Sequence, residues 1–240
     1  MKKFIVLSAL LGALAVAPHP LAFAADGGGS DQIGIYVAPK FVYGLTHISG
    51  SKVADTDGSG SWSTGTHNDS AFGGSIAVGY DFEKQFAVPV RAEVEYAGFS
   101  QVEAKRHIND PSNGPVGTIK QTYNIHTVFA NAYFDIDTST LVTPYVGAGL
   151  GTAFITSNAK YKEDASGEVE RSGAKTKTNF AWNVGTGVGF DFTDNITLDV
   201  GYRFVGLGSA KTKTQHDDDW YGKTDALYQH QFSTGVRFTF

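Results

Sequence analysis

The chain has 240 residues, with 19 lysines and arginines against 24 aspartates and glutamates, a formal net charge of −5, and no cysteine. This acidic balance without a basic cluster excludes a protein that binds nucleic acid by neutralising phosphates. The lack of cysteine excludes disulfides and thiolate metal sites, so we expect no metal centre and no cofactor.

The first 24 residues have the pattern of a secretory signal peptide. Two lysines precede an apolar run over residues 4–16, and a small-x-small pattern ends at Ala24. The alternative, an anchor helix that stays attached, needs about 20 apolar residues, more than this run provides. We therefore predict cleavage after Ala24, a short segment over 25–31, and one folded domain over 32–240.

The rest of the chain alternates apolar and polar residues with a period of two. Such alternation predicts β-strands, because successive side chains of a strand point to opposite faces. Eight segments follow the pattern, and each is long enough to cross a bilayer at a tilt, which takes about 9 to 11 residues. They cover Ile33–His47, Ala71–Phe82, Val88–Gln101, Thr122–Phe134, Pro144–Ile155, Asn179–Phe192, Ile196–Val205 and Leu227–Phe240.

The side chains of the two phases differ in size as well as in polarity. The apolar phase is crowded with aromatic and branched residues, whereas the other phase is small or charged. Glycines spaced by two, at 147–151 and 185–189, indicate a strand face where small residues relieve crowding or let the barrel wall bend. The segment Thr122–Phe134 is apolar in both phases; we place Val128 outside and Asn131 inside.

The connections between the segments alternate in length. Short turns on one side and long loops on the other are typical of a bacterial outer-membrane barrel, with the long loops outside the cell. The short connections are 83–87, 135–143 and 193–195, and the long polar ones are 50–70, 103–121, 156–178 and 206–226.

A soluble eight-stranded barrel gives the same alternation, with its apolar phase turned inward. Three features favour the membrane. The small residues of the charged phase fit a narrow interior, aromatic residues gather at both ends of the strands, and the chain ends on an apolar-phase residue, Phe240. The sequence therefore predicts an all-β, eight-stranded antiparallel transmembrane up-and-down β-barrel in the outer membrane of a Gram-negative bacterium.

Three motifs, Phe86–Tyr96, Thr143–Gly151 and Leu198–Phe204, resemble the strands of opacity-protein-like outer-membrane β-barrels, a group also labelled porin-like. The resemblance covers the strands and not the loops. It implies an eight-stranded barrel, and some members of the group bind host receptors through their outer loops. It also implies that the last strand, ending at Phe240, is presented to the barrel-assembly machinery and closes against the first strand.

Charged residues of the inward phase predict a network inside the barrel. An eight-stranded barrel leaves room only for its own side chains, and ions buried there need partners. We expect the cations to pair with the carboxylates and fill the interior; a polar conduction path is the alternative. The predicted network comprises Lys40, Arg91, Glu93, Glu95, Asp199, Arg203 and Arg237, with Asp81 and Asp191 in the same phase.

Catalysis has little support in the sequence. His126 lies in a strand, but Val128 stands two residues on, where a serine partner would share its face, so we predict that the protein is not an enzyme. The acidic run 216–219 could hold a hard cation, although a solvated loop accounts for it as well.

The long loops carry the candidate contact residues. Trp62, Trp220 and Tyr221 stand among glycine, serine and aspartate, as contact anchors do, although packing of the loops against one another is the favoured explanation. The lysines of 156–178 could meet lipopolysaccharide phosphates. We predict a surface protein whose loops mediate adhesion to a host or environmental ligand, with a small porin-like or structural barrel as the alternative.

Overall fold

The computed structural model describes residues 33–55, 61–110, 114–138, 140–163, 169–171, 174–211 and 220–240. The predicted signal peptide and the segment 25–31 lie outside these residues, as does the acidic run 216–219.

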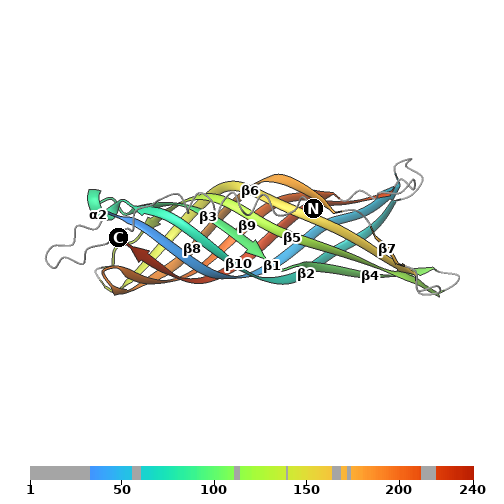
Figure 1. Ribbon diagram of the computed structural model, residues 1–240, viewed down its shortest axis with the longest axis horizontal. Helices are drawn as coiled ribbons and strands as arrows, with labels where there is room; N and C mark the ends of the chain where they lie inside the picture. Colours follow the sequence, from blue (N-terminus) through green and yellow to red (C-terminus); the bar gives the residue numbers. More distant parts are fainter. Residues whose placement is uncertain are drawn as a thin grey trace, which may run out of the picture. The chain divides into compact units, whose positions relative to one another are not determined.

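The described chain folds into a closed antiparallel β-barrel of strongly tilted strands (Figure 1). Strands β3 and β4 form one wall strand interrupted at residues 100–101, and β7 is a short addition beside β6, so the wall has eight strands, as predicted. The strands are β1 (Ile35–Asp55), β2 (Ser61–Asp81), β3 (Val90–Phe99), β4 (Val102–Asp110), β5 (Gly114–Asp135), β6 (Val142–Glu163), β7 (Val169–Arg171), β8 (Lys175–Thr193), β9 (Ile196–Lys211) and β10 (Trp220–Thr239).

The first and last strands close the barrel. Along β1 and β10, Tyr36 stands opposite Thr239 and Asp55 opposite Trp220. The ladder reaches the last residue, because Phe240 accepts a hydrogen bond from the Gly34 amide at 3.0 Å and donates one to Ile35 at 2.8 Å. The prediction that the terminal strand closes against the first is confirmed.

The short connections lie at the end of the barrel that carries the C-terminus. Strand β2 leads into a one-turn helix, α2 (Glu83–Phe86), and β8 turns directly into β9. Ala87, with φ of 52°, ends the helix in the left-handed conformation. Among the described residues, no helix is both long and apolar enough to span a membrane.

At the opposite end the strands run much further than the sequence predicted. The four connections predicted as loops are largely β-structure: β1 and β2 stay paired as far as Ala54 and Ser61, and β5 and β6 as far as Gly117 and Glu163. The prediction of long loops was wrong because it relied on apolar alternation. Alternation marks the wall that faces lipid, whereas backbone pairing continues between polar strands without it.

This outer extension divides into two sheets. Pairing between β2 and β3 ends at Gly73 and Phe99, and pairing between β8 and β9 ends at Trp182 and Gly206. Beyond these points β9, β10, β1 and β2 stay paired as one sheet, and β4, β5, β6 and β8 as another. Side chains bridge the divisions; the Asn179 side-chain amide, for example, donates to two carbonyls of β9.

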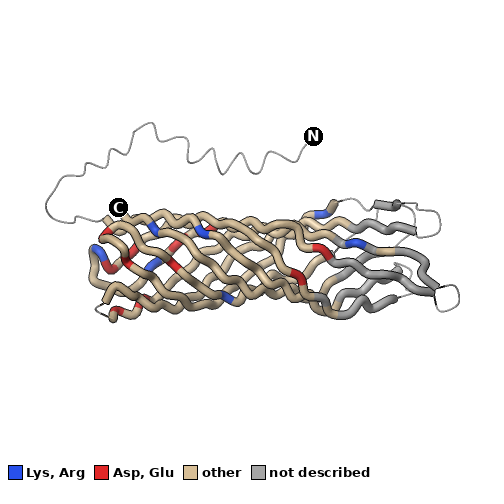
Figure 2. The backbone as a smooth tube through the Cα atoms, turned by 90° about the horizontal axis from the view of Figure 1, so that it is seen from below, with Lys and Arg blue, Asp and Glu red and all other residues tan. Residues whose placement is uncertain are grey.

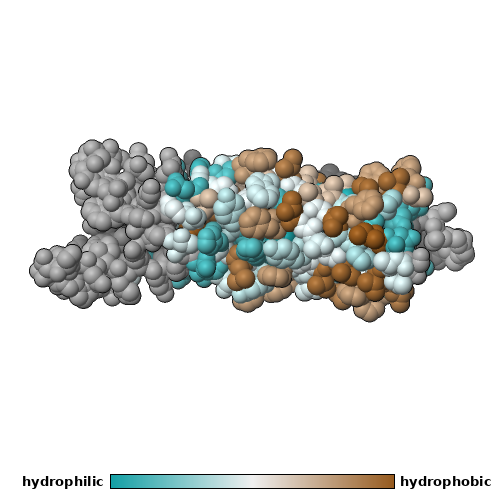
Figure 3. Space-filling view, turned by 180° about the vertical axis from the view of Figure 1, so that it is seen from behind, coloured by the Kyte–Doolittle hydropathy of each residue, from teal (hydrophilic) through white to brown (hydrophobic). Residues whose placement is uncertain are grey.

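The outer wall of the barrel is apolar. Side chains such as Phe72 and Phe180 are 59% and 67% exposed to the surroundings, and apolar side chains cover much of the wall in Figure 3. So many exposed apolar side chains suit lipid rather than water. Most of the described charged residues lie in the half of the barrel that carries the C-terminus (Figure 2).

Candidate functional site

The centre of the interior holds a chain of ion pairs that crosses the barrel. Lys40 of β1 donates from Nζ to Glu93 Oε1 and to Glu95 Oε2, both at 2.9 Å. Arg203 of β9 donates from Nη2 to the other oxygen of Glu95 at 2.6 Å. Both carboxylates come from β3, on the same inward phase, so the two cations separate charges that would otherwise repel each other.

Neutral donors complete the shell of Glu93. The hydroxyls of Tyr36 and Tyr133 donate to it at 3.0 and 2.8 Å, and the Asn131 amide donates at 3.3 Å. With Lys40, this carboxylate has four donors from two strands, β1 and β5, and a buried charge needs such partners.

A second chain of hydrogen bonds continues from Arg203 toward the outer half. Its Nε donates to Gln231, which donates to Gln229, which donates to Thr46 at 3.0 Å. The two glutamines are almost completely buried. The sequence analysis did not select them because neither is charged.

Nearer the C-terminal end, Arg91 pairs with Asp135 rather than with the carboxylates of its own strand. Its Nε and Nη2 lie 2.5 and 2.8 Å from the two carboxylate oxygens. The guanidinium also lies over the rings of Tyr133 and Tyr145, 5.1 and 4.9 Å from their centroids. Asp135 was missed because the prediction ended its strand one residue earlier, although it shares the inward phase of Asn131.

Two predicted residues stand apart from the central chain. Asp199 accepts a hydrogen bond from the Tyr145 hydroxyl at 2.6 Å. Arg237 is buried, lies 5.7 Å from the Tyr36 ring centroid, and has an Nη1 without a hydrogen-bond partner among the described residues. It lines a cavity of about 250 Å³ at the end with the short turns, together with Asp81 and other acidic residues.

The inward glycines make room for tyrosine rings. Tyr36 stands opposite Gly79, Tyr133 opposite Gly147, and Tyr145 opposite Gly187. A Cβ atom on each of these glycines would lie 2.3 Å from the ring of its partner, closer than atoms can approach. Of the two predicted roles of the glycines at 147–151 and 185–189, relief of crowding inside the barrel applies to Gly147 and Gly187.

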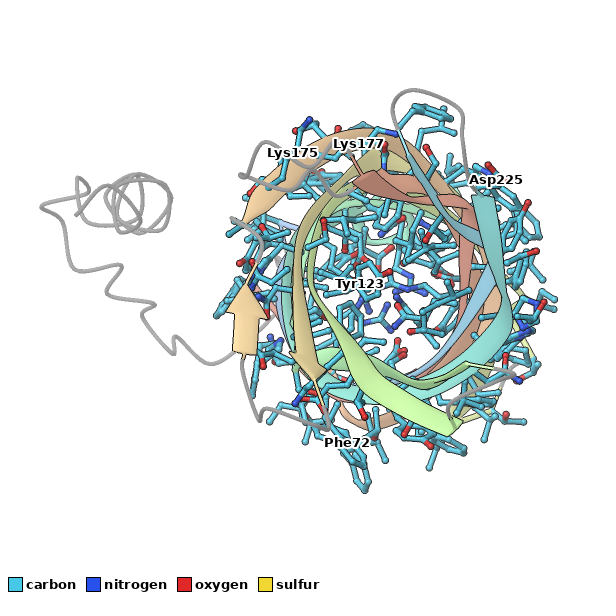
Figure 4. The ribbon with its side chains drawn as sticks, turned by 90° about the vertical axis from the view of Figure 1, so that its right-hand side faces the viewer. Phe72, Tyr123, Lys175, Lys177 and Asp225 are labelled. Atoms are coloured by element: carbon cyan, nitrogen blue, oxygen red, sulfur yellow. The ribbon has the colours of Figure 1, made fainter. Side chains whose placement is uncertain are left out.

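The outer half of the interior contains an apolar core, which the sequence analysis did not predict. Buried side chains from both outer sheets pack there, and Tyr123 points into the interior in Figure 4, whereas Phe72 points away from the barrel. The sequence feature that could have predicted this core is the presence of apolar residues in both phases of Thr122–Phe134. This interior core includes Ile48, Phe99, Val102, Tyr123, Ile125, Phe129, Ile155, Leu207 and Leu227.

The predicted contact residues lie on strands rather than in loops, which corrects the sequence analysis. Trp62 is in β2, and Trp220 and Tyr221 are in β10. Trp62 stands opposite Val53 of β1, and Trp220 stands opposite Asp55, two residues further on.

His126 lies on the outer wall. Its Nδ1 is 2.9 Å from the Tyr96 hydroxyl, and the two rings stack with centroids 6.0 Å apart. His230 makes the same arrangement with Tyr202, at 2.8 Å. The repeated pairing fits aromatic residues at a membrane boundary.

A closed barrel with an apolar outer wall and an interior filled by its own side chains defines an integral outer-membrane β-barrel protein of a Gram-negative bacterium. The chain belongs to the family of the outer membrane protein beta-barrel domain, whose model matches residues 6–240. This confirms the resemblance to outer-membrane barrels and the predicted location.

The chain is similar to the outer membrane protein PagN of Salmonella typhimurium, with 28% identity over 94% of this chain and 98% of PagN. It is 26% identical, over 56% of its length and 57% of the relative's, to a Rickettsia conorii protein named as a proposed adhesin. Among solved structures, Neisserial surface protein A matches with 22% identity and a TM-score of 0.47, covering 86% of this chain and 97% of that protein.

Proposed function

We propose that the protein is an adhesin, in which the barrel anchors the chain and the outer extension contacts a host or environmental ligand. The observation that carries this proposal is the length of the paired strands beyond the apolar wall. From the level of His126 and Phe154, β5 and β6 remain paired for nine more positions, to Gly117 and Glu163. At about 3.3 Å per residue this is roughly 30 Å of strand. A strand does not need this additional length to cross the bilayer.

The comparisons add support from a relative. The Rickettsia conorii protein is named as a proposed adhesin, and its similarity covers more than half of this chain. In our proposal Trp62 of β2 and Trp220 of β10 contribute to the contact surface, because tryptophan is enriched where binding energy concentrates.

The interior supports the role of an anchor. Ion pairs and tyrosine rings fill one half, and an apolar core packs in the other, as expected of a barrel filled by its own side chains. A small porin is the second candidate, because the inner half is polar. Planar-bilayer recordings with the purified protein separate the two: an anchor gives no stepwise openings, and regular steps favour the porin.

We further propose that residues 1–24 direct export and that the strand ending at Phe240 is the segment recognised during barrel assembly. We also propose that the protein has no catalytic activity. His126, the residue considered for catalysis, is engaged with Tyr96 on the wall.

Shortening the outer extension tests adhesion directly. Residues 49–66, 104–121, 158–174 and 209–226 are each replaced by a two-residue turn, so that the cuts fall at paired strand positions. Non-adherent bacteria that express either form are counted on host cells. We expect adhesion with the full chain and its loss with the shortened one, while heat-modifiable migration in gels shows that both barrels fold. Equal adhesion by both forms removes the proposal.

A further inference from the structure

The end of the barrel with the short turns holds a cavity of about 250 Å³ with a largely polar lining. In an outer-membrane barrel this end faces the periplasm. Drug-sized ligands occupy pockets of about 300–1,000 Å³, so this cavity suits a smaller molecule. Figure 2 shows charges of both signs at this end. Among the described residues, the cavity is lined by five carboxylates, at Asp81, Glu83, Asp135, Asp191 and Asp194, and by two cations, Lys84 and Arg237.

Arg237 of β10 lines this cavity without a partner of its own. It is 7% exposed, and its Nη1 is buried without a hydrogen-bond partner in the described part of the chain. It forms no ion pair with Asp81, Asp135 or Asp191, the inward carboxylates of the same cavity. Because a buried cation without a partner is costly, this arrangement indicates an anion that does not come from the described chain.

The position of the guanidinium is set by a tyrosine ring and a glycine rather than by a carboxylate. Its central carbon lies 5.7 Å from the centroid of the Tyr36 ring on β1. Toward β8, a Cβ atom added to Gly189 would lie 3.5 Å from Nη2. The side chain of Arg237 therefore reaches from β10 across β9 to β8, at the mouth of the interior.

Asp81 and Asp191 supply the opposite charge. Each carboxylate uses one oxygen within the protein. Asp81 Oδ1 accepts a hydrogen bond from the Glu83 amide at 3.0 Å, and Asp191 Oδ1 accepts one from the Thr197 hydroxyl at 2.6 Å. The second oxygen of each carboxylate has no partner among the described residues, so it can accept a hydrogen bond from a ligand.

The carboxylates at this end also repel one another. Burial raises the pKa of Glu83, and the nearby charges of Asp81 and Asp135 raise it further. Arg91 takes both oxygens of Asp135, which leaves the charge of Asp81 without such compensation. A cationic group placed in the cavity would relieve this repulsion.

From this combination we propose that the cavity binds an α-ammonium carboxylate, the group that every free amino acid carries. The ligand's carboxylate accepts hydrogen bonds from Arg237, and its ammonium donates to Asp81 and Asp191. Hydrogen bonds between ionised groups are shorter and stronger than those between neutral groups. An anion alone would be repelled by the acidic side, and a cation alone would leave Arg237 unpaired, so a ligand with both charges fits best. This inference is independent of adhesion.

Calorimetric titration of the mature protein in octyl glucoside, an uncharged detergent, tests the proposal. The probe is free meso-diaminopimelate, and acetate and ethylamine each supply only one of its two kinds of charge. R237Q removes the cation of the cavity, and D191N removes one carboxylate. D137N is the matched control, because Asp137 is exposed at the same end and does not line the cavity.

We expect diaminopimelate to bind at least about tenfold more tightly than acetate or ethylamine, because it makes charge-assisted hydrogen bonds at both ends of the cavity. R237Q and D191N should each weaken its binding about tenfold, and D137N should stay within about twofold. Since Arg237 has no partner to lose, R237Q should keep the urea midpoint of the natural protein, which separates binding from a structural role.

Three results overturn the proposal. Equal affinity for ethylamine and diaminopimelate would reduce the site to its acidic residues, and equal affinity for acetate would reduce it to Arg237. Unchanged binding by R237Q or by D191N overturns it as well. Heat-modifiable migration confirms folding of each variant.

Two periplasmic sources carry this group, namely free amino acids and peptidoglycan, whose diaminopimelate side chain ends in the same ammonium and carboxylate. A soluble peptidoglycan fragment that ends on diaminopimelate distinguishes them in the same titration. Binding at least as tight as that of free diaminopimelate assigns the cavity to the cell wall. Loss of binding with the fragment assigns it to free amino acids.

Discussion

Arg91 and Asp135 form a two-point ion pair between strands β3 and β5, with nitrogen–oxygen distances of 2.5 and 2.8 Å. Both side chains are buried, at 3% and 5% exposure. Removing one partner of such a pair leaves an uncompensated charge in the interior, and this costs far more than the pair contributes.

We therefore expect Arg91→Met to lower the free energy of unfolding by about 3–5 kcal/mol. Urea unfolding in detergent micelles measures it. The double variant with Asp135→Leu should recover much of the loss, because it removes both charges. A single variant as stable as the natural protein would show that the pair is not desolvated.

The fit between tyrosine rings and inward glycines gives a second prediction. Gly147→Ala places a Cβ 2.3 Å from the Tyr133 ring and 2.9 Å from the Ala132 carbonyl oxygen, so it should destabilise the barrel by about 1–3 kcal/mol. Gly74→Ala is the matched control, because the nearest atom to its Cβ lies 3.8 Å away. Equal unfolding midpoints for the two variants would contradict the fit.

The inner polar network could be anticipated only in part from the sequence. Period-two alternation correctly assigned Glu93 and Glu95 to one inward face, because side-chain direction in a strand is a local property. It could not show that Lys40 lies between them. That contact depends on the register of β1, β2 and β3, which brings together residues more than 50 positions apart.

The outer half was harder to predict. Ile125 and Phe129 point inward and Val128 points outward, so alternation of polarity is lost where both faces are apolar. Further out, serines and threonines pair across strands, as Thr156 and Thr176 do at 2.8 Å between their hydroxyls. These polar strands have the same amino-acid composition as loops. Only their pairing with residues far away in the sequence distinguishes them from loops.

The apolar core of the outer half should contribute strongly to stability. Leu227 is 1% exposed inside the barrel, and Leu150 is 62% exposed on the lipid-facing wall. Leu227→Ala should therefore lower the free energy of unfolding by about 2–5 kcal/mol, and Leu150→Ala by clearly less, since it leaves no cavity in the core. Chemical unfolding of both variants compares them. A larger loss at Leu150 would mean that lipid contact outweighs the interior core.

A pH dependence is expected at the end with the short turns. Partial burial raises the pKa of Glu83 in α2, and the carboxylates of Asp81 and Asp135 raise this pKa further. A raised folded-state pKa means that folding favours the protonated form, so Glu83 destabilises the barrel once pH exceeds that pKa. Glu83→Gln should raise the urea midpoint at pH 7, and the gain should vanish near pH 4. A gain that persists at pH 4 would assign the effect to something other than charge.

The last residue offers a test that separates assembly from stability. Phe240 is held by backbone hydrogen bonds to Gly34 and Ile35, and these bonds do not depend on its side chain. Phe240→Ala should therefore leave the unfolding midpoint of the refolded, purified barrel within about 1 kcal/mol of the natural value, as a change at the edge of the wall does. If the aromatic ring is read during assembly, the same variant should accumulate less in the outer membrane of growing cells. Phe238→Ala, two residues earlier on the same lipid-facing phase, is the control, and it should reduce accumulation less. Pulse-chase labelling with gel-shift detection of the folded barrel measures the rate of barrel assembly. Equal assembly rates for both variants would show that the ring of Phe240 is not the feature recognised during assembly.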